Sequence, residues 1–208
     1  IHSACTLCGY FEACTRIGLA HRGGDAQACF DALRVPGLLA EADMRRATAG
    51  VNTHKGAIFS LGIACASLGM SWGEPFSAEH ILLRCGEMTR LRMQDELENA
   101  RQGQARTFGE QVYQKKGVGG VRAEAAGGFA GVRETALPRL NAALDAGLSL
   151  NDAALCALTA LMARTEDTNA VRRGGEAGAK AMREKAQMLD SRMTAAIAAG
   201  KAQEVLDD

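Results

Sequence analysis

The sequence predicts an all-α protein, and three observations carry this prediction. Aromatic residues make up only 4% of the 208 residues and there are 3 prolines, although strands favour aromatic and β-branched side chains. Helix-favouring residues such as alanine, leucine, glutamate and arginine are abundant instead. Apolar residues recur three and four positions apart, whereas strand alternation is nowhere convincing. We therefore expect one helical domain over residues 1–208, long enough to bury a core.

The first quarter of the chain is expected to hold three helical segments. Residues 1–21 look like one helix, which Gly23-Gly24 ends. Asp25 can cap the next helix, and Pro36-Gly37 is expected to break it. Further helical turns over residues 38–47 then lead into a glycine-bounded loop.

Two longer helices follow that loop. The first is apolar on all sides and runs to about Met70, so we expect it to be buried. Ser77 can cap the second, which is amphipathic and lies on the surface of the core. Its apolar stripe consists of Ile81, Cys85, Met88 and Leu91.

The second half begins with a segment that lacks a helical pattern. From Arg101 to Phe129 glycines punctuate the chain, and we expect a loop-rich region. A helix returns from about Val132 to Ala146, and another follows from Asp152, capped by Asn151. The apolar side of that second helix carries Leu155, Leu158 and Met162.

The chain ends in a long predicted helix. The preceding helix stops at Asp167-Thr168-Asn169, and Gly174-Gly175 then interrupts the chain. One stripe of the last helix carries Met182, Ala186, Leu189, Met193 and Ile197.

Charge and cysteine content narrow the functional classes. Lys+Arg and Asp+Glu both number 24, which argues against a nucleic-acid-binding protein because that class needs a basic excess. No segment reaches transmembrane length, so we expect a cytoplasmic protein with no membrane partner. The 7 cysteines include Cys5-x-x-Cys8, but no second ligand pair completes a zinc site. We expect reduced thiols that pack as small hydrophobes.

The most informative polar segment is Gly50–Gly56, which precedes the apolar helix. Asn52 and Thr53 can form hydrogen bonds, His54 can carry a proton, and Lys55 is a compact cation. The following helix offers backbone N–H groups and a positive dipole end to an anion. The segment therefore suggests a phosphate-rich ligand, although an ordinary helix start has a similar composition.

Two further polar segments lie at expected helix ends. Arg122 and Glu124 stand among glycines, where an exposed surface pair is the simpler interpretation. Asp167 and Asn169 offer oxygen ligands suited to a hard cation. Arg172 and Arg173 suit phosphate, and Gly174-Gly175 opens a helix whose start can face an anion. A capped helix with two solvated arginines is the alternative there.

Taken together, these segments resemble the ATP:dephospho-CoA triphosphoribosyltransferase family, also called triphosphoribosyl-dephospho-CoA synthase. The longest match is Ala47-Thr48-Ala49-Gly50-Val51-Asn52-Thr53-His54-Lys55-Gly56, followed by Ile58-Phe59-Ser60-Leu61-Gly62. The others are Gly120-Val121-Arg122-Ala123-Glu124-Ala125 and Asp167-Thr168-Asn169 through Arg173-Gly174-Gly175. Two family patterns, Lys-Pro-Gly-Leu-Val-Asp and Ser-Pro-Gly-Gly-Ser-Ala-Asp, are absent from this chain, so we expect a portion of a longer enzyme. Ala123 and Ala130 stand where the family usually has glycine and proline.

The resemblance implies an all-helical enzyme that joins ATP to 3′-dephospho-CoA and releases adenine. The product is the precursor of the prosthetic group of citrate lyase or malonate decarboxylase, which a separate transferase attaches to the carrier protein. Mg²⁺ is expected to accompany ATP. Two alternatives stay open: a Mg²⁺-dependent helical hydrolase of nucleotides or ADP-ribose, and a non-catalytic helical binding protein.

The implied reaction assigns hypothetical roles to the polar residues. Lys55 and Arg173, with the helix start after Gly174-Gly175, would hold triphosphate oxygens. Asp167 and Glu124 would bind Mg²⁺ or act as the base, and His54 would contact a phosphate or transfer a proton. The remaining residues expected to bind ATP or orient its parts are Asn52, Thr53, Arg122 and Asn169.

Overall fold

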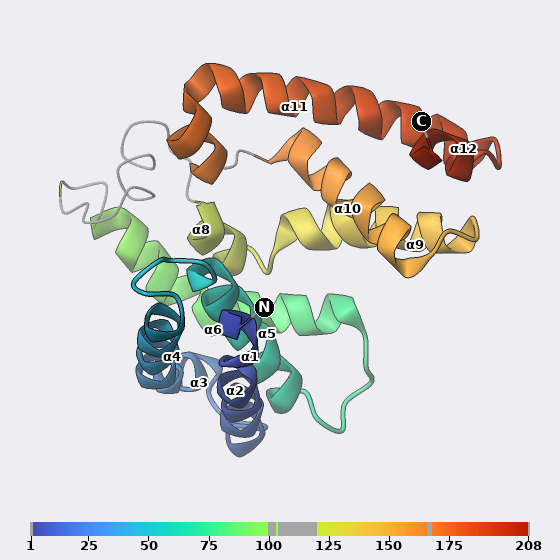
Figure 1. The fold of residues 1–208 in the computed structure, drawn as a ribbon. Helices are drawn as coiled ribbons and strands as arrows, with labels where there is room; N and C mark the ends of the chain where they lie inside the picture. The colour runs from blue at the N-terminus through green and yellow to red at the C-terminus, as the bar shows by residue number, and fades with distance from the viewer. Residues whose placement is uncertain (1, 100–102, 104–119, 166–167, 208) are drawn as a thin grey trace. The chain divides into compact units, whose positions relative to one another are not determined.

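Every regular element described by the computed structural model of this protein is helical, which confirms the all-α prediction (Figure 1). The structure describes residues 2–99, 103, 120–165 and 168–207. Contacts group the chain into an N-terminal unit, Ile1–Gln104 with Val121–Phe129, and a C-terminal unit, Ala105–Gly120 with Ala130–Asp208. Within the described ranges, no helix is long and apolar enough to cross a membrane.

The N-terminal unit is built around one buried helix, α5. Its helices are α1 (His2–Cys5), α2 (Cys8–Ala20), α3 (Ala26–Ala32), α4 (Arg34–Ala47), α5 (Lys55–Met70), α6 (Ala78–Asn99) and α8 (Gly120–Ala126). The expected apolar helix is confirmed as α5, which buries Ile58, Ile63 and Met70.

Glycines let α2 and α5 pack with their backbones in contact. A Cβ atom at Gly18 of α2 would overlap the carbonyl of Ala66, and one at Gly69 of α5 would overlap the carbonyl of Thr15. A Cβ atom at Gly62 would overlap the hydroxyl of Tyr10, which donates a hydrogen bond to the Ile58 carbonyl at 3.0 Å. Burial of Tyr10 raises the pKa of its hydroxyl. Only glycine fits at Gly18 and Gly69, where a methyl group would meet backbone, whereas at Gly62 the Tyr10 ring would have to shift.

Two helix boundaries near the N-terminus differ from the expected ones. The single helix over residues 1–21 is wrong, because the chain breaks between α1 and α2, where the Thr6 hydroxyl bonds to the Ser3 carbonyl at 2.8 Å and Leu7 turns into the core. The break at Pro36-Gly37 is also wrong. Pro36 lies in the first turn of α4, where its missing N–H has no helical partner to lose.

Caps predicted for two helices are confirmed. The Asp25 side chain accepts a hydrogen bond from the Gln27 amide at 2.9 Å at the start of α3, and the Ser77 hydroxyl accepts one from the His80 amide at 3.0 Å before α6. The stripe predicted for α6 is partly wrong. Cys85 and Met88 are buried, but Leu91 is 63% exposed.

The described end of the expected loop-rich region is a helix, so that part of the prediction is wrong. Residues 121–126 are mostly helix formers, and α8 ends at Ala126, two residues before Gly128, whose φ of +67° suits glycine. The backbone of Gly128 lies against Gly86 of α6 and the Leu82 carbonyl. The segment 104–119, which includes Glu110 and Tyr113, lies outside the described residues.

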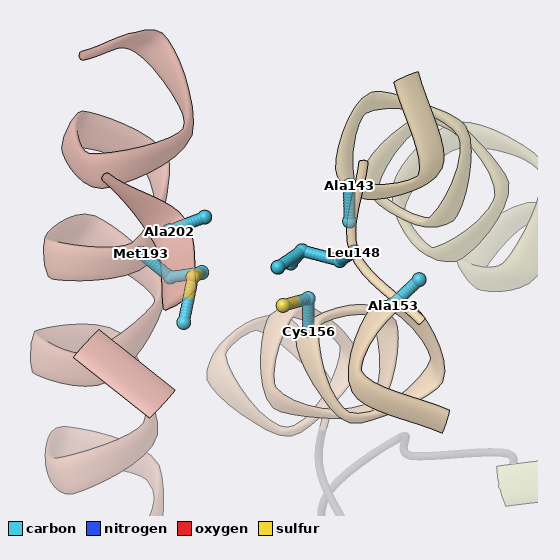
Figure 2. Close-up of a cluster of buried hydrophobic side chains, with 6 residues drawn as sticks. All are labelled: Ala143, Leu148, Ala153, Cys156, Met193 and Ala202. Atoms are coloured by element: carbon cyan, nitrogen blue, oxygen red, sulfur yellow. The ribbon is translucent and has the colours of Figure 1, made fainter. Parts of the chain in front are cut away.

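The C-terminal unit packs small side chains between its helices. It contains a π-helical turn, η2 (Val132–Ala136), and α9 (Leu137–Asp145), α10 (Leu150–Arg164), α11 (Thr168–Ala198) and α12 (Ala202–Asp207). Figure 2 shows its core, which consists of Ala143, Leu148, Ala153, Cys156, Met193 and Ala202. Arg139 of α9 and Asp190 of α11 form an ion pair at 2.7 Å beside this core.

Details of α10 and α11 correct the sequence interpretation. Ser149, not Asn151, caps α10, because its hydroxyl accepts the Asp152 amide at 3.2 Å. Leu155 and Leu158 of the expected apolar side are exposed, and alanines with Cys156 occupy the buried side.

The expected interruption is confirmed at Gly175, whose φ of 66° and ψ of −177° break α11. In the stripe expected beyond this kink, Ala186 and Met193 are buried, Met182 and Ile197 are partly buried, and Leu189 is 52% exposed.

All seven cysteines are free, and four of them are buried: Cys14, Cys29, Cys85 and Cys156. Burial raises the pKa of the Cys14 thiol to about 11 and that of the Cys85 thiol to about 12. The exposed thiols are Cys5 and Cys8. Within the described ranges, no group of three or more His, Cys, Asp or Glu residues is arranged to hold a metal ion.

Replacing Gly69 with alanine should lower the free energy of unfolding by about 1–3 kcal/mol or more, because the new methyl group overlaps the α2 backbone. The control is Gly56→Ala in the same helix, where a Cβ atom meets nothing within 4 Å. That change should be neutral or stabilising by up to about 1 kcal/mol. Urea denaturation followed by circular dichroism measures both, and equal stabilities of the two variants would contradict the tight helix contact.

Stability should fall at alkaline pH because of the buried thiols. In the unfolded chain a cysteine thiol has a pKa of about 8.5. Folding raises the pKa of Cys14 to about 11 and that of Cys85 to about 12. The stabilisation is therefore complete below pH 8.5 and is lost as pH rises toward 12. Denaturation at pH 8 and pH 10.5 tests this. The loss should shrink in Cys85→Ala but not in Cys8→Ala, where the thiol is exposed; equal losses in both variants would sink the explanation.

Candidate functional site at the start of α5

The loop between α4 and α5 reverses the chain through two residues with positive φ. Ala49 and Gly50 have φ values of 52° and 90°, and the Gly50 amide donates to the Arg45 carbonyl at 2.7 Å. This bond closes α4 in the manner of a Schellman motif. The Thr48 hydroxyl adds a bond to the Met44 carbonyl at 2.8 Å. The loop conformation is thus fixed from the α4 side.

The other end of the loop is fixed by α5 and by the core. The Oδ1 atom of Asn52 accepts a hydrogen bond from the Lys55 amide at 3.1 Å, so Asn52 caps the first turn. The His54 amide donates to the Sδ atom of Met44 at 3.0 Å. Met44 is fully buried in a cluster with Leu7, Ala40 and Ile58. The backbone at His54 is therefore anchored directly to the core.

The side chain of His54 is held by two hydroxyl groups. Its Nδ1 atom lies 2.9 Å from Thr53 Oγ1 and 3.0 Å from Ser3 Oγ. The two hydroxyl oxygens are themselves 3.2 Å apart. Ser3 belongs to α1 and is buried, whereas His54 is partly exposed. Nothing in the sequence pairs Ser3 with His54, because about fifty residues separate them.

Lys55 has a charged partner that the sequence analysis missed. Its Nζ atom lies 3.0 Å from Oε2 of Glu41, with 49% of the lysine side chain and 23% of the glutamate side chain exposed. Glu41 lies on α4. The signal for it was its position on the helix expected to lead into the loop. A carboxylate therefore stands beside the cation that was predicted to bind phosphate.

Arg122 and Glu124 lie on α8 and not in a loop. The Nε atom of Arg122 lies 3.2 Å from Oε2 of Glu96 on α6, and both side chains are partly exposed. Residues two apart on a helix do not face each other. Arg122 thus pairs with a residue of the neighbouring helix, and this contact ties α8 to α6.

The third polar segment belongs to the C-terminal unit. Asp167 lies outside the described residues, and Asn169 is placed only as part of the first turn of α11. Arg173, Gly174 and Gly175 are exposed before the kink of that helix, which is visible in Figure 1. A Cβ atom at Gly174 or Gly175 would meet nothing within 4 Å, so open space surrounds this turn.

The structure therefore brings together one of the three predicted segments with two unpredicted residues. Asn52, Thr53, His54 and Lys55 meet Ser3 and Glu41 at the start of α5. Arg122 and Glu124 lie on α8 of the same unit, and Arg173 to Gly175 belong to the other unit. Their convergence on one ligand stays a prediction, as does the metal role of Glu124 and Asp167.

Known proteins match the chain along almost its whole length. The model of the family described as ATP:dephospho-CoA triphosphoribosyl transferase matches residues 1–207. Two relatives named probable 2-(5''-triphosphoribosyl)-3'-dephosphocoenzyme-A synthase are each 39% identical over 191 residues. They come from Vibrio cholerae serotype O1, strains M66-2 and El Tor Inaba N16961.

These matches cover 91% of this chain and 61% of each relative. The chain thus spans about three fifths of the length of these curated relatives. No solved structure matches it. The family model covers the α4–α5 loop and both other polar segments. The chain therefore belongs to the ATP:dephospho-CoA triphosphoribosyl transferase family.

Proposed function

We propose that the whole protein transfers the triphosphoribosyl group of ATP to the 2′-hydroxyl of 3′-dephospho-CoA and releases adenine. The observation that carries the proposal is that His54 and Lys55 both stand at the start of α5. A proton-carrying ring and an ammonium group stand there beside the first N–H groups of the helix, of which that of Lys55 is bonded to Asn52. This combination suits a reaction that moves a proton next to a triphosphate. Family membership supplies the substrates.

The reaction exchanges one bond at the anomeric carbon of ATP. The 2′-oxygen of dephospho-CoA forms a bond to that carbon, and the bond from the carbon to adenine breaks. The transition state resembles the oxocarbenium ion of glycoside hydrolysis. The attacking hydroxyl gives its proton to a base, and adenine departs with the bonding electron pair and takes up a proton. We assign Glu124 or Asp167 as the base and His54 to proton transfer or phosphate contact.

The triphosphate would be held by cations and helix starts. Lys55 and Arg173 supply charge, and the turn after Gly174-Gly175 supplies backbone N–H groups. Mg²⁺ commonly binds through one or two carboxylates together with substrate phosphates. We propose Glu124 and Asp167 as the carboxylates, and Asn52, Thr53, Arg122 and Asn169 as groups that orient ATP.

The product suggests the setting in which the protein works. A triphosphoribosyl-dephospho-CoA is a precursor of the prosthetic group of citrate lyase or malonate decarboxylase. A second transferase would consume it, and both substrates are cytoplasmic metabolites. We therefore place the protein in the cytoplasm, upstream of a carrier-protein transferase.

Adenine release tests the proposal against its two rivals. The full-length protein is incubated with ATP and Mg²⁺, with and without 3′-dephospho-CoA, and free adenine is followed by chromatography. We expect adenine only when dephospho-CoA is present. Adenine without it would show a hydrolase, and no adenine in either mixture would show a binding protein; either result would overturn the transferase proposal.

The Lys55–Glu41 pair predicts opposite effects of two substitutions on triphosphate affinity. Lys55→Met should weaken binding of inorganic tripolyphosphate, measured by calorimetry, because it removes a cation. Glu41→Gln should tighten binding by up to about fivefold, because the phosphate then no longer has to displace the Glu41 carboxylate from Lys55. An ion pair near the surface contributes about 0–1 kcal/mol. Glu12→Gln, which breaks the exposed Arg16 pair on α2, is the control and should change nothing. Weaker binding by Glu41→Gln would refute the competition.

A further inference from the structure

We infer that Ser3 is a positioning residue of the α5 site: with Thr53 it holds Nδ1 of His54, so that Nε2 is the ring nitrogen that meets the substrate. The inference rests on the proposed function. It concerns a residue of α1 that carries no recognisable motif. Ser3 itself is not expected to touch substrate.

The burial of Ser3 makes its hydroxyl a specific anchor. The residue is only 6% exposed, and a buried hydroxyl without a hydrogen bond is costly. Its Oγ atom finds Thr53 Oγ1 at 3.2 Å and His54 Nδ1 at 3.0 Å. Both partners belong to the α4–α5 loop. The hydroxyl is therefore satisfied in the described structure by this arrangement of the loop.

The position of Ser3 is in turn fixed by its own backbone. The Thr6 hydroxyl donates to the Ser3 carbonyl at 2.8 Å and the Thr6 amide bonds to the His2 carbonyl at 3.2 Å. The next residue, Leu7, is 1% exposed and packs in the cluster that contains Met44. Ser3 thus stands on a short helix that is secured to the same core as the loop.

These contacts define which way the imidazole ring can face. The backbone amide of His54 is bonded to the sulfur of Met44, and Nδ1 of its ring is bonded to two hydroxyl groups. Rotating the ring by half a turn would replace Nδ1 with a carbon atom and break both hydroxyl contacts. Each hydroxyl can donate to Nδ1 or accept from it, so the two contacts fix the plane of the ring. Nε2 is then presented in a single orientation.

This arrangement deepens the proposed role of His54. A proton passed to adenine or to a phosphate oxygen needs a donor atom held within hydrogen-bond reach. Ser3 reduces the freedom of the ring at that step without contacting the reacting atoms. Its removal should therefore lower turnover more than substrate affinity.

The test compares Ser3→Ala with Cys5→Ala, a change at an exposed position of the same helix, in the full-length protein. Long-range ¹H–¹⁵N spectra report how the proton is shared between the two ring nitrogens of each of the four histidines. The His54 signals are assigned by their loss in His54→Gln. We expect well-separated nitrogen signals for His54 in the wild type, and signals that move toward each other in Ser3→Ala. Cys5→Ala keeps the Ser3 hydroxyl and its hydrogen bonds and should resemble the wild type.

Kinetics of adenine release give a second readout. Ser3→Ala should lower kcat by about tenfold or more, since proton transfer by a positioned group contributes about 100-fold to 10,000-fold, and leave KM for ATP nearly unchanged. In a His54→Ala background, Ser3→Ala should cause no further loss, because its effect passes through the ring. A further loss there would overturn the inference.

The spectra separate failure of this inference from failure of the proposed function. If Ser3→Ala leaves the His54 signals unchanged, the positioning role is wrong even if the protein is a transferase. If the wild type releases no adenine but the signals move, the proposed function is wrong and the hydrogen-bond arrangement stands. Should Ser3→Ala fail to fold, Thr53→Val removes the other hydroxyl from an exposed position and must shift the same signals.

Discussion

The backbone contact between α2 and α5 is the constraint on which the N-terminal unit depends. Gly18 and Gly69 let the two helices approach closer than any side chain would permit. Leu7, which precedes α2, and Ile58 of α5 pack in one cluster. Ser3 and His54 therefore lie at the same end of this helix pair, where their side chains bond. A contact made for packing thus constrains a polar site at the helix ends.

The sequence predicted helix existence better than helix boundaries. Buried α5 and the caps at Asp25 and Ser77 were predictable because apolar runs and capping side chains act locally. The first-turn position of Pro36 and the helix over residues 121–126 were not. Pro36 is tolerated because a first-turn N–H has no helical partner, and the glycines around 121–126 stand outside that run of helix formers. The apolar stripes failed at Leu91, where Thr89 and Met93 are buried instead, and at Leu158, where alanines and Cys156 fill the buried side.

In the candidate site, too, the residues with a local signal in the sequence were predicted and the others were missed. Asn52 to Lys55 were found because their types cluster in sequence, and the structure keeps them together. Ser3 and Glu41 were missed, because each reaches the loop through folding and neither stands in a motif. Single residues brought from distant helices leave no local signature. Arg122 was expected beside Glu124, but helix geometry directs it toward Glu96.

Met44 has two duties that usually fall to different residues. Its thioether fills the core beside Leu7 and Ile58, and its sulfur accepts the amide proton of His54. Leucine or isoleucine would fill similar space but offer no acceptor. A substitution at Met44 therefore acts on the hydrophobic interior and on the backbone at His54 together. A library that repacks this core for thermal resistance would also change the loop that leads into α5.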